Sequence, residues 1–382
     1  MSVYKKRLIL LRLSFIIWGI ILGIVGAELF LKVQYANTLD AHDSAWTVKF
    51  GNQLDNELIY SYVPNFSSNW KKDEFDQHVS INEIGCRSQS LPKVKYKSEY
   101  RIFFIGDSYT FGQGISKNEL TYPALFEKYI NRENDLTKKV NAYNCGVQGY
   151  SPDQEYRQLQ SKITLNKPDM VIWTILIPAD LYDLTHTNKE LWNVPSLYNV
   201  QNNLLVPINA KHNWLYVQNW IFTNMPEWFW NSYTFKMIIR KISLIKFFNN
   251  IPYMNDRDMM DWGLKKLTLE IREAFSLSEK FNFSLIIVVM PHKYMYTGEA
   301  FSKEYITAVT ELVKKLKDTG IRIIDMSTEI NRYNQMNYQL NEGSKFQPLE
   351  LYFKNDFHPN EKGADFFAKI LSAKVLESKV IN

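Results

Sequence analysis

The sequence has few cysteines, no strong excess of either charge and only one long apolar run, and each shortage excludes a class of protein. Two cysteines among 382 residues, Cys86 and Cys145, are too few for a disulfide-built scaffold or a four-cysteine zinc site. We therefore expect Cys145 to be a buried thiol. A formal net charge of +5, from 45 basic and 40 acidic residues, is far from the dense basic patch that nucleic acid requires.

Metal and nucleotide motifs are also missing. The histidines are scattered without the spacing of metal ligands, so no metal site is predicted. There is no P-loop, no G-x-G-x-x-G and no G-x-S-x-G, which argues against a nucleotide enzyme and against an α/β-hydrolase elbow. No cofactor is expected.

The one long apolar run lies in residues 1–34 and predicts a membrane anchor. Leu13–Ala27 carry no charge, and basic residues precede them. If Arg12 and Glu28 reach out of the hydrocarbon, a span from Leu8 to Leu31 provides the roughly 20 residues that a bilayer requires. The basic cluster holds the amino terminus in the cytoplasm by the positive-inside rule, so the rest of the chain lies outside.

A cleaved signal peptide is the alternative for the same segment. The uncharged core is short, and Val25-Gly26-Ala27 offers the small residues that a signal peptidase accepts. Both alternatives export the remaining chain, so we expect a periplasmic or cell-surface location.

The exported part divides into an extension and one large domain. Residues 35–97 contain short aromatic and polar pieces without a helical period, and they predict an irregular cover with one or two short strands. Residues 98–382 alternate apolar runs with helical patterns, interrupted by an insertion at 184–257.

The alternation in the large domain predicts a parallel sheet with helices on both faces. Five compact apolar runs suit strands buried on both sides: 100–106, 139–146, 169–176, 283–290 and 321–326. Helical patterns occupy 119–133, 152–166, 258–281, 301–318 and 361–377. Ligands of such sheets bind beyond the carboxyl ends of the strands, which is where we look for chemistry.

The insertion at 184–257 is rich in aromatic residues and has two explanations. It carries five of the ten tryptophans: Trp192, Trp214, Trp220, Trp228 and Trp230. It is either a small helical subdomain whose aromatics form its own core, or a lid that faces the substrate.

Polar residues suited to acyl transfer follow the predicted strands. Ser108 comes after the first strand between glycines, which allow the sharp turn that presents a nucleophile. Gly149 follows the second strand, and His358 with a neighbouring acid follows the fifth. A serine, a histidine and an acid at one edge of a sheet are the parts of a catalytic triad.

These residues resemble those of the SGNH, or GDSL-type, esterases and acylhydrolases. GDSYTFG at 106–112 is similar to the block that holds the family's nucleophile, Gly149 matches the second-block glycine of the oxyanion hole, and HPNEKG at 358–363 is similar to the last block. The stretch INEIGCR at 81–87 resembles a segment of membrane-anchored bacterial members. The resemblance implies a flavodoxin-like three-layer sandwich around a five-stranded parallel sheet.

The chain departs from the family pattern at two positions. Ala179, followed by Asp180, stands where the family usually has an asparagine that completes the oxyanion hole. The acid three residues before the histidine is replaced by Asn355, while Asp356 lies two residues before it and can share a face with His358 in an extended segment. We therefore expect Asp356 to orient His358, with Asn355 as the alternative.

The expected function is hydrolysis of a carboxylic ester on an extracytoplasmic glycan, lipid or envelope polymer. Ser108 would form the acyl-enzyme, His358 would act as the base, and the N–H groups of Ser108 and Gly149 would hold the oxyanion. Asp107 is expected to brace the turn at the nucleophile, and Asp180 to fix loop geometry or line the cleft. An acyltransferase using the same serine and a non-catalytic carbohydrate-binding protein remain the alternatives.

Overall fold

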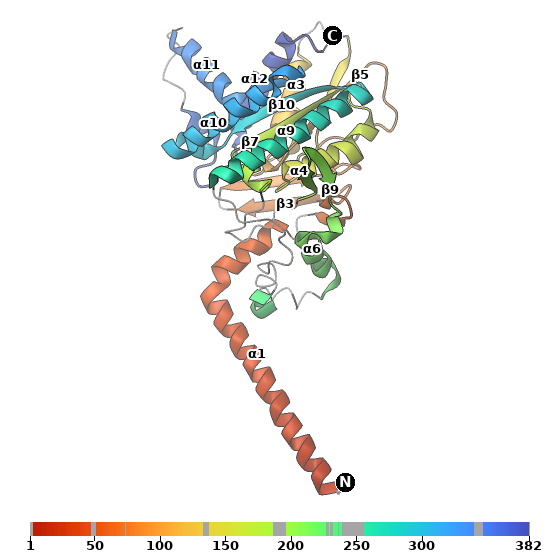
Figure 1. The fold of residues 1–382 in the computed structure, drawn as a ribbon, viewed down its shortest axis with the longest axis vertical. Helices are drawn as coiled ribbons and strands as arrows, with labels where there is room; N and C mark the ends of the chain where they lie inside the picture. The colour runs from red at the N-terminus through yellow and green to blue at the C-terminus, as the bar shows by residue number, and fades with distance from the viewer. Residues whose placement is uncertain are drawn as a thin grey trace.

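The computed structural model describes residues 3–46, 51–72, 74–132, 137–185, 196–226, 229, 232–235, 237–238, 256–339 and 347–381. Its centre is a parallel sheet with the order β11-β10-β7-β5-β6 (Figure 1). The strands are β5 (Glu99–Ile105), β6 (Lys139–Asn144), β7 (Met170–Ile177), β10 (Ser284–Pro291) and β11 (Arg322–Asp325). Numbered along the chain, this is the flavodoxin-like order 2-1-3-4-5, which confirms the predicted fold class.

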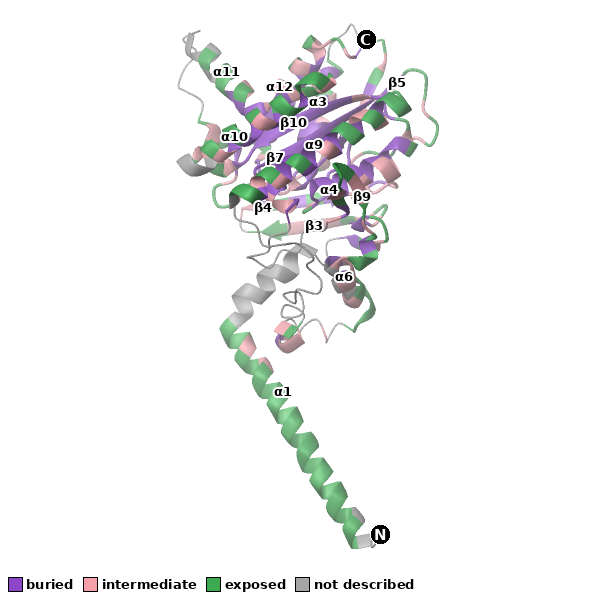
Figure 2. Ribbon diagram, viewed as in Figure 1, coloured by how far each residue is buried: buried purple, intermediate pink, exposed green. Residues whose placement is uncertain are grey.

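Helices cover both faces of the sheet, and the strand residues alternate between them. The helices of one face are α3 (Tyr122–Ile130), α11 (Met326–Gln339) and α12 (Glu361–Glu377), and those of the other are α4 (Pro152–Gln158), α9 (Asp256–Phe281) and α10 (Glu299–Leu316). Ile102 and Phe104 of β5 belong to the apolar core on the side of α3, α11 and α12. Phe103 and Ile105 belong to the core on the side of α4, α9 and α10. The sheet is therefore buried between two helical layers, as Figure 2 shows.

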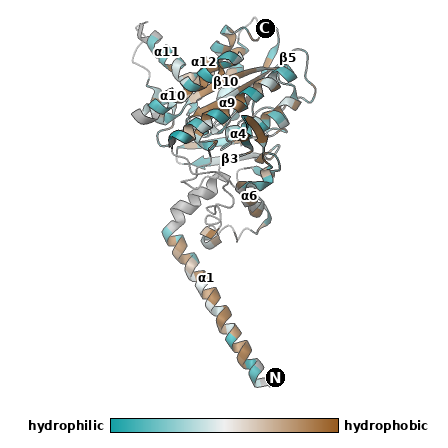
Figure 3. Cartoon of the chain, viewed as in Figure 1, coloured by the Kyte–Doolittle hydropathy of each residue, from teal (hydrophilic) through white to brown (hydrophobic). Residues whose placement is uncertain are grey.

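Helix α1 (Val3–Trp46) extends away from this sandwich (Figure 1). Its segment Arg7–Gln34 has a mean hydropathy of 2.6 in its most apolar window, and none of that window is buried. Figure 3 shows hydrophobic residues along most of this helix. Length and composition suit a membrane span, although a signal sequence passes the same test.

The extension is more regular than predicted. Its described residues contain four strands in two antiparallel hairpins: β1 (Asn52–Asp55) with β2 (Ile59–Tyr62), and β3 (Ser67–Lys72) with β4 (Phe75–Ser80). The expected one or two strands were too few. Burial in β4 alternates strictly, because Phe75, Gln77 and Val79 point inward and the residues between them face outward.

A disulfide joins the extension to the sheet. Cys86 is bonded to Cys145, which directly follows β6, and the expectation of a buried free thiol at Cys145 was wrong. The two cysteines are 59 positions apart in the chain, so no local pattern indicated that they pair.

The insertion combines strands and a helix, whereas the sequence predicted helices alone. Its described part contains a hairpin, β8 (Tyr198–Gln201) with β9 (Leu204–Pro207), and helix α6 (Trp214–Asn224). Trp220 is 49% exposed. The side chains of the other four tryptophans lie outside the described residues, so the two explanations of the aromatic residues stay open.

Candidate active site

Ser108 sits on a sharp turn between β5 and the short helix α2 (Ser108–Phe111). Gly106 has φ +152°, and a Cβ there would collide with the side chain of Thr110 and the carbonyl of Thr174. Asp107 is the N-cap of α2, since its Oδ1 accepts the N–H of Tyr109 at 2.8 Å. The turn therefore places Ser108 at the carboxyl edge of the sheet.

Three side chains that the sequence singled out come together here. Ser108 Oγ lies 2.8 Å from Nε2 of His358, and Nδ1 of the same ring lies 2.5 Å from Oδ1 of Asp356. His358 is 3% exposed. A serine, a histidine and an acid are thus connected in the order of a catalytic triad, although 250 positions separate Ser108 from His358 in the chain.

The acid next to His358 is held in its charged form. Burial raises the pKa of Asp356, but the hydrogen bonds and charge of His358, with the charge of Lys72, outweigh it and hold this pKa well below its ordinary value. Lys72 Nζ lies 3.4 Å from the second carboxylate oxygen. Asn355 contacts this part of the structure through its backbone N–H, so the geometry favours Asp356 over Asn355 as the orienting group.

The loop that carries Asp356 is fixed by one anion and one cation. Glu74 Oε2 accepts the N–H groups of Asn355 and Asp356, both at 2.8 Å. Lys293 Nζ donates to three carbonyls of the same loop, those of Phe353 (2.6 Å), Lys354 (2.7 Å) and Asp356 (3.1 Å). Glu74 and Lys293 therefore fix the backbone from which the Asp356 carboxylate projects. Neither residue was predicted, because a contact to backbone leaves no pattern in the sequence.

Aromatic rings enclose the imidazole of His358. The ring of Phe357 stacks on it with centroids 4.2 Å apart, and Tyr109 lies at 5.5 Å. The Tyr109 hydroxyl donates to the carbonyl of Phe357 at 2.8 Å. Burial lowers the pKa of the neighbouring His292 to about 4, and the charges of His358 and Lys293 add to the effect. His292 is therefore neutral at physiological pH and adds no charge beside the base.

The predicted oxyanion hole uses the backbone N–H groups of Ser108 and Gly149. Gly149 follows β6 with φ +71°, and among the described residues no acceptor pairs with its N–H. Ala179 begins helix α5 (Ala179–Asp183), packs against the apolar cluster and has no side-chain donor. The N–H of Gly149 is thus available for the predicted role, and Ala179 cannot replace the asparagine amide that the family usually has.

Asp107, Asp180 and Asp183 are carboxylates close enough to affect one another's pKa. Asp180 Oδ2 accepts the N–H of Leu176 at 2.6 Å and is directed into the protein, so it fixes the loop after β7. Burial raises the pKa of Asp180 well above its ordinary value, and that of Asp107 to about 6. Burial and the charge of Asp107 together raise the pKa of Asp183 to about 7.

Arg87 braces the nucleophile turn from behind and was not predicted as a site residue. It is 1% exposed, and burial lowers its pKa to about 10. Its guanidinium donates to the carbonyls of Phe111, Gly112, Ile115 and His78, and to the side chain of Asn118. The only signal in the sequence was its place in the INEIGCR stretch, beside the disulfide-bonded Cys86.

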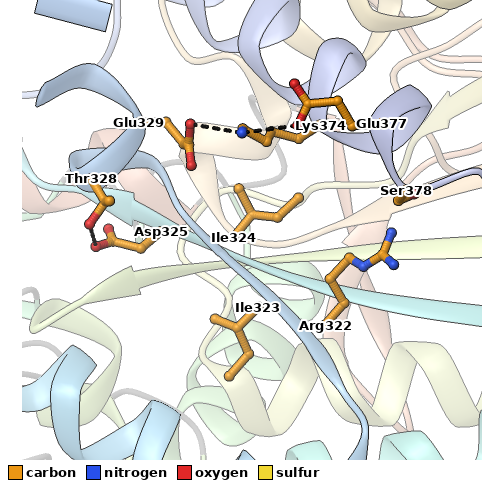
Figure 4. Close-up of a pocket in the computed structure, with 9 residues that line it drawn as sticks. All are labelled: Arg322, Ile323, Ile324, Asp325, Thr328, Glu329, Lys374, Glu377 and Ser378. Carbon is orange, nitrogen blue, oxygen red and sulfur yellow. Dashed lines mark hydrogen bonds and ion pairs between the residues drawn. The ribbon is translucent and has the colours of Figure 1, made fainter. Parts of the chain in front are cut away.

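A separate cavity of about 420 Å³ lies along the edge strand β11 (Figure 4). Lys374 spans it from α12, pairing with Glu329 at 3.3 Å and Glu377 at 3.1 Å. None of its lining residues belongs to the Ser108 site. Within the described part of the chain, no group of three or more His, Cys, Asp or Glu residues is arranged to hold a metal ion.

No protein-family model and no curated protein sequence matches the chain. Solved structures do match it. They include a protein assigned to the G-D-S-L lipolytic family from Desulfitobacterium hafniense DCB-2 (13% identity, 72% of this chain and 98% of that one, TM-score 0.38). Two others are the acetyl xylan esterase AlAXEase (14%, 72% and 99%, TM-score 0.41) and a catalytic mutant of the acetylxylan esterase Axe2 from Geobacillus stearothermophilus (12%, 74% and 96%, TM-score 0.40).

The G-D-S-L family of the first match is the one that the motifs around Ser108 and His358 resemble. The likeness to GDSL-type proteins therefore rests on these motifs. At these identities and TM-scores, the solved structures carry no argument about its substrate or activity.

Proposed function

We propose that this chain is a serine ester hydrolase of the GDSL type, with Ser108 as nucleophile, His358 as base and Asp356 as the acid that orients the base. The observation that carries the proposal is the continuous hydrogen-bonded path from Ser108 Oγ through the imidazole to the Asp356 carboxylate. A scaffold that only bound carbohydrate would have no use for this alignment.

The reaction follows from the geometry. Nε2 of His358 takes the proton of Ser108 as Oγ attacks the ester carbonyl, and the N–H groups of Ser108 and Gly149 stabilise the oxyanion. His358 then returns the proton to the leaving alcohol as the carbon–oxygen bond of the ester breaks. Water, activated by the same imidazole, releases the acyl group as a carboxylic acid. Asp356 stays ionised throughout and stabilises the imidazolium.

Ala179 sets a limit on the expected rate. A missing oxyanion donor costs about 10²–10³ in rate, roughly 3 kcal/mol, in enzymes built to use it. We therefore expect turnover of activated esters to be slower than in relatives that carry the asparagine.

The proposed location is outside the cytoplasm, with the chain anchored by α1. Two independent features support it: basic residues before the apolar run, and the disulfide between Cys86 and Cys145, since disulfides persist in oxidising compartments. In that location the substrates at hand are acylated glycans, lipids and envelope polymers. A reporter enzyme fused after residue 40 should be active only on the exported side.

Turnover of short-chain p-nitrophenyl esters by the full chain in detergent tests the proposal. Ser108→Ala should abolish nearly all activity, whereas Ser276→Ala, an exposed serine on α9, should not change it. An unchanged rate in Ser108→Ala would exclude Ser108 as the nucleophile. Adding a sugar acceptor separates the alternatives: acyl transfer to sugar in place of water identifies a transferase, and no turnover with retained sugar binding identifies a binding protein.

A further inference from the structure

The described side chains of helix α1 contact the rest of the protein at one place. Of the residues in the candidate span Arg7–Gln34 whose side chains are described, Glu28 and Leu31 are partly covered and the others are exposed. Residues three apart lie on the same face of a helix, so these two mark a single contact.

The partner at this contact is the insertion. The Glu28 carboxylate accepts the Ser232 hydroxyl at 2.9 Å, the Tyr233 N–H at 2.6 Å and the Thr234 N–H at 2.9 Å. Two of these donors are backbone groups, so the carboxylate fixes the path of the insertion as well as one side chain. The insertion is thereby attached to the candidate membrane span itself.

The position of Glu28 defines the depth of the contact. The uncharged segment Leu13–Ala27 rises about 22 Å as a helix, somewhat less than the roughly 30 Å of a hydrocarbon core. Glu28 is the next residue, so it lies where hydrocarbon gives way to headgroups on the exported side. Residues 232–234, bonded to Glu28, lie at the same level.

The described part of the insertion also exposes apolar side chains. Trp220 is 49% exposed, Met225 41% and Ile238 48%. Residues 213–226 contain no charged residue. Figure 1 shows α6 on the side of the sandwich from which α1 extends. Tryptophan beside uncharged chain is typical of the membrane–water interface.

We infer that the insertion binds the surface of the bilayer that α1 crosses, with Trp220, Met225 and Ile238 entering the boundary between headgroups and acyl chains. The occupant of this apolar surface is lipid, because the surface is continuous with a membrane span through Glu28. The inference rests on the proposed anchor. It gives the catalytic domain a second attachment to the membrane, which fixes its orientation.

Lipid-phase quenching of a fluorophore tests this inference on the full chain. Both native cysteines are in the disulfide, so a thiol-reactive, environment-sensitive fluorophore labels only the new cysteine of Ile238→Cys or Trp220→Cys. The matched control is Leu165→Cys, 75% exposed in the turn Thr164–Asn166 that precedes β7, at the amino edge of the sheet. Each variant is reconstituted in vesicles of phosphatidylcholine and phosphatidylglycerol with brominated acyl chains.

We expect acyl-chain bromine to quench the labels at 238 and 220 several-fold more than the label at 165, and aqueous iodide to show the reverse order. Flotation with the vesicles is measured on the same samples. If the chain floats but all three labels respond to iodide alike, the anchor stands and the inference fails. Labels shielded from both quenchers, with cross-linked dimers, would show that a second copy covers the surface. A chain that does not float contradicts the anchor, and the inference fails with it.

Discussion

The N-terminal extension and the insertion both lie outside the five-stranded sheet, but they contact different parts of the molecule. The extension reaches the catalytic groups, through Arg87 behind the nucleophile turn and Glu74 on the Asp356 loop. The described part of the insertion is held on the side of α4, where Arg157 donates to the Tyr198 hydroxyl at 2.6 Å. It is also attached to the extension, where the Tyr216 hydroxyl donates to Oδ1 of Asn56 at 2.7 Å, and to α1 through Glu28.

Composition did not predict this difference. The polar, irregular extension was expected to be a cover, and the aromatic insertion was expected to be either a subdomain with its own core or a lid that faces the substrate. The difference shows that backbone carbonyls and N–H groups, the partners of Arg87 and Glu74, decide which segment supports the chemistry. The following variants test whether the two segments differ in this way.

The largest effect is expected from the acid that the extension supports. Asp356→Asn should lower kcat by about 10⁴-fold, because an amide favours the wrong imidazole tautomer and does not stabilise the imidazolium. Asn355→Ala should change kcat little, since Asn355 contributes its backbone N–H. Steady-state kinetics on an activated ester measures both. The reverse ranking would assign the orienting role to Asn355.

Two arginines provide a matched comparison of the segments. Arg87→Ala removes a buried cation that pairs with several carbonyls, so it should destabilise the fold by about 3–5 kcal/mol and lower kcat. Arg157→Ala should cost about 1 kcal/mol and leave kcat unchanged, because Arg157 holds only the hairpin of the insertion. Denaturant unfolding and kinetics measure the two effects. Equal losses of kcat would remove the distinction between the segments.

Glu74 should have a smaller effect, confined to catalysis. Glu74→Ala frees the two N–H groups of the Asp356 loop and should lower kcat about tenfold, with KM little changed, equivalent to about 1.4 kcal/mol. Glu83→Ala is the control, since Glu83 also accepts a backbone N–H in the extension, that of Leu91. A loss of kcat in both variants would point to general loosening of the extension.

The smallest effect is expected on the pH at which acid unfolds the protein. The folded-state pKa of Asp356 is depressed, so its contribution to stability is complete above the unfolded value and is lost as pH falls through the folded value. Lys72→Met removes one charge that lowers this pKa, so acid unfolding should begin at a slightly higher pH. Lys71→Met, which removes an exposed partner of Asp76, should not shift it. Circular dichroism against pH measures the midpoints, and equal midpoints would contradict the role of Lys72.

The sheet was predictable because its strands are buried on both faces and therefore appear as continuous apolar runs. All five strands lie within about two residues of the expected ranges. Helix α11 was missed because the segment is largely polar. Of its described side chains, those of Met326, Ser327 and Ile330 are buried, which is too narrow a stripe for a helical period. The number of strands in the extension was underestimated because strands of four to six residues are too short to show a clear alternating pattern.

Site residues divide by the kind of partner they have. Ser108, Asp356 and His358 were found because their chemistry demands particular residue types, and the structure brings them together. Glu74, Arg87 and Lys293 bind backbone, which any sequence supplies, so nothing marked them. The disulfide was missed because the approach of two distant segments is decided by tertiary packing.

The disulfide also concerns when this site becomes complete. Cys86 precedes Arg87, which supports the Ser108 turn, and Cys145 lies four residues before Gly149. One disulfide therefore links the segment behind Ser108 to the segment of the predicted oxyanion hole. A reducing cytoplasm leaves that fastening open, and an oxidising compartment closes it. In the proposed location, a newly made chain would acquire its full rigidity only after export, away from the thioesters and acylated metabolites of the cytoplasm.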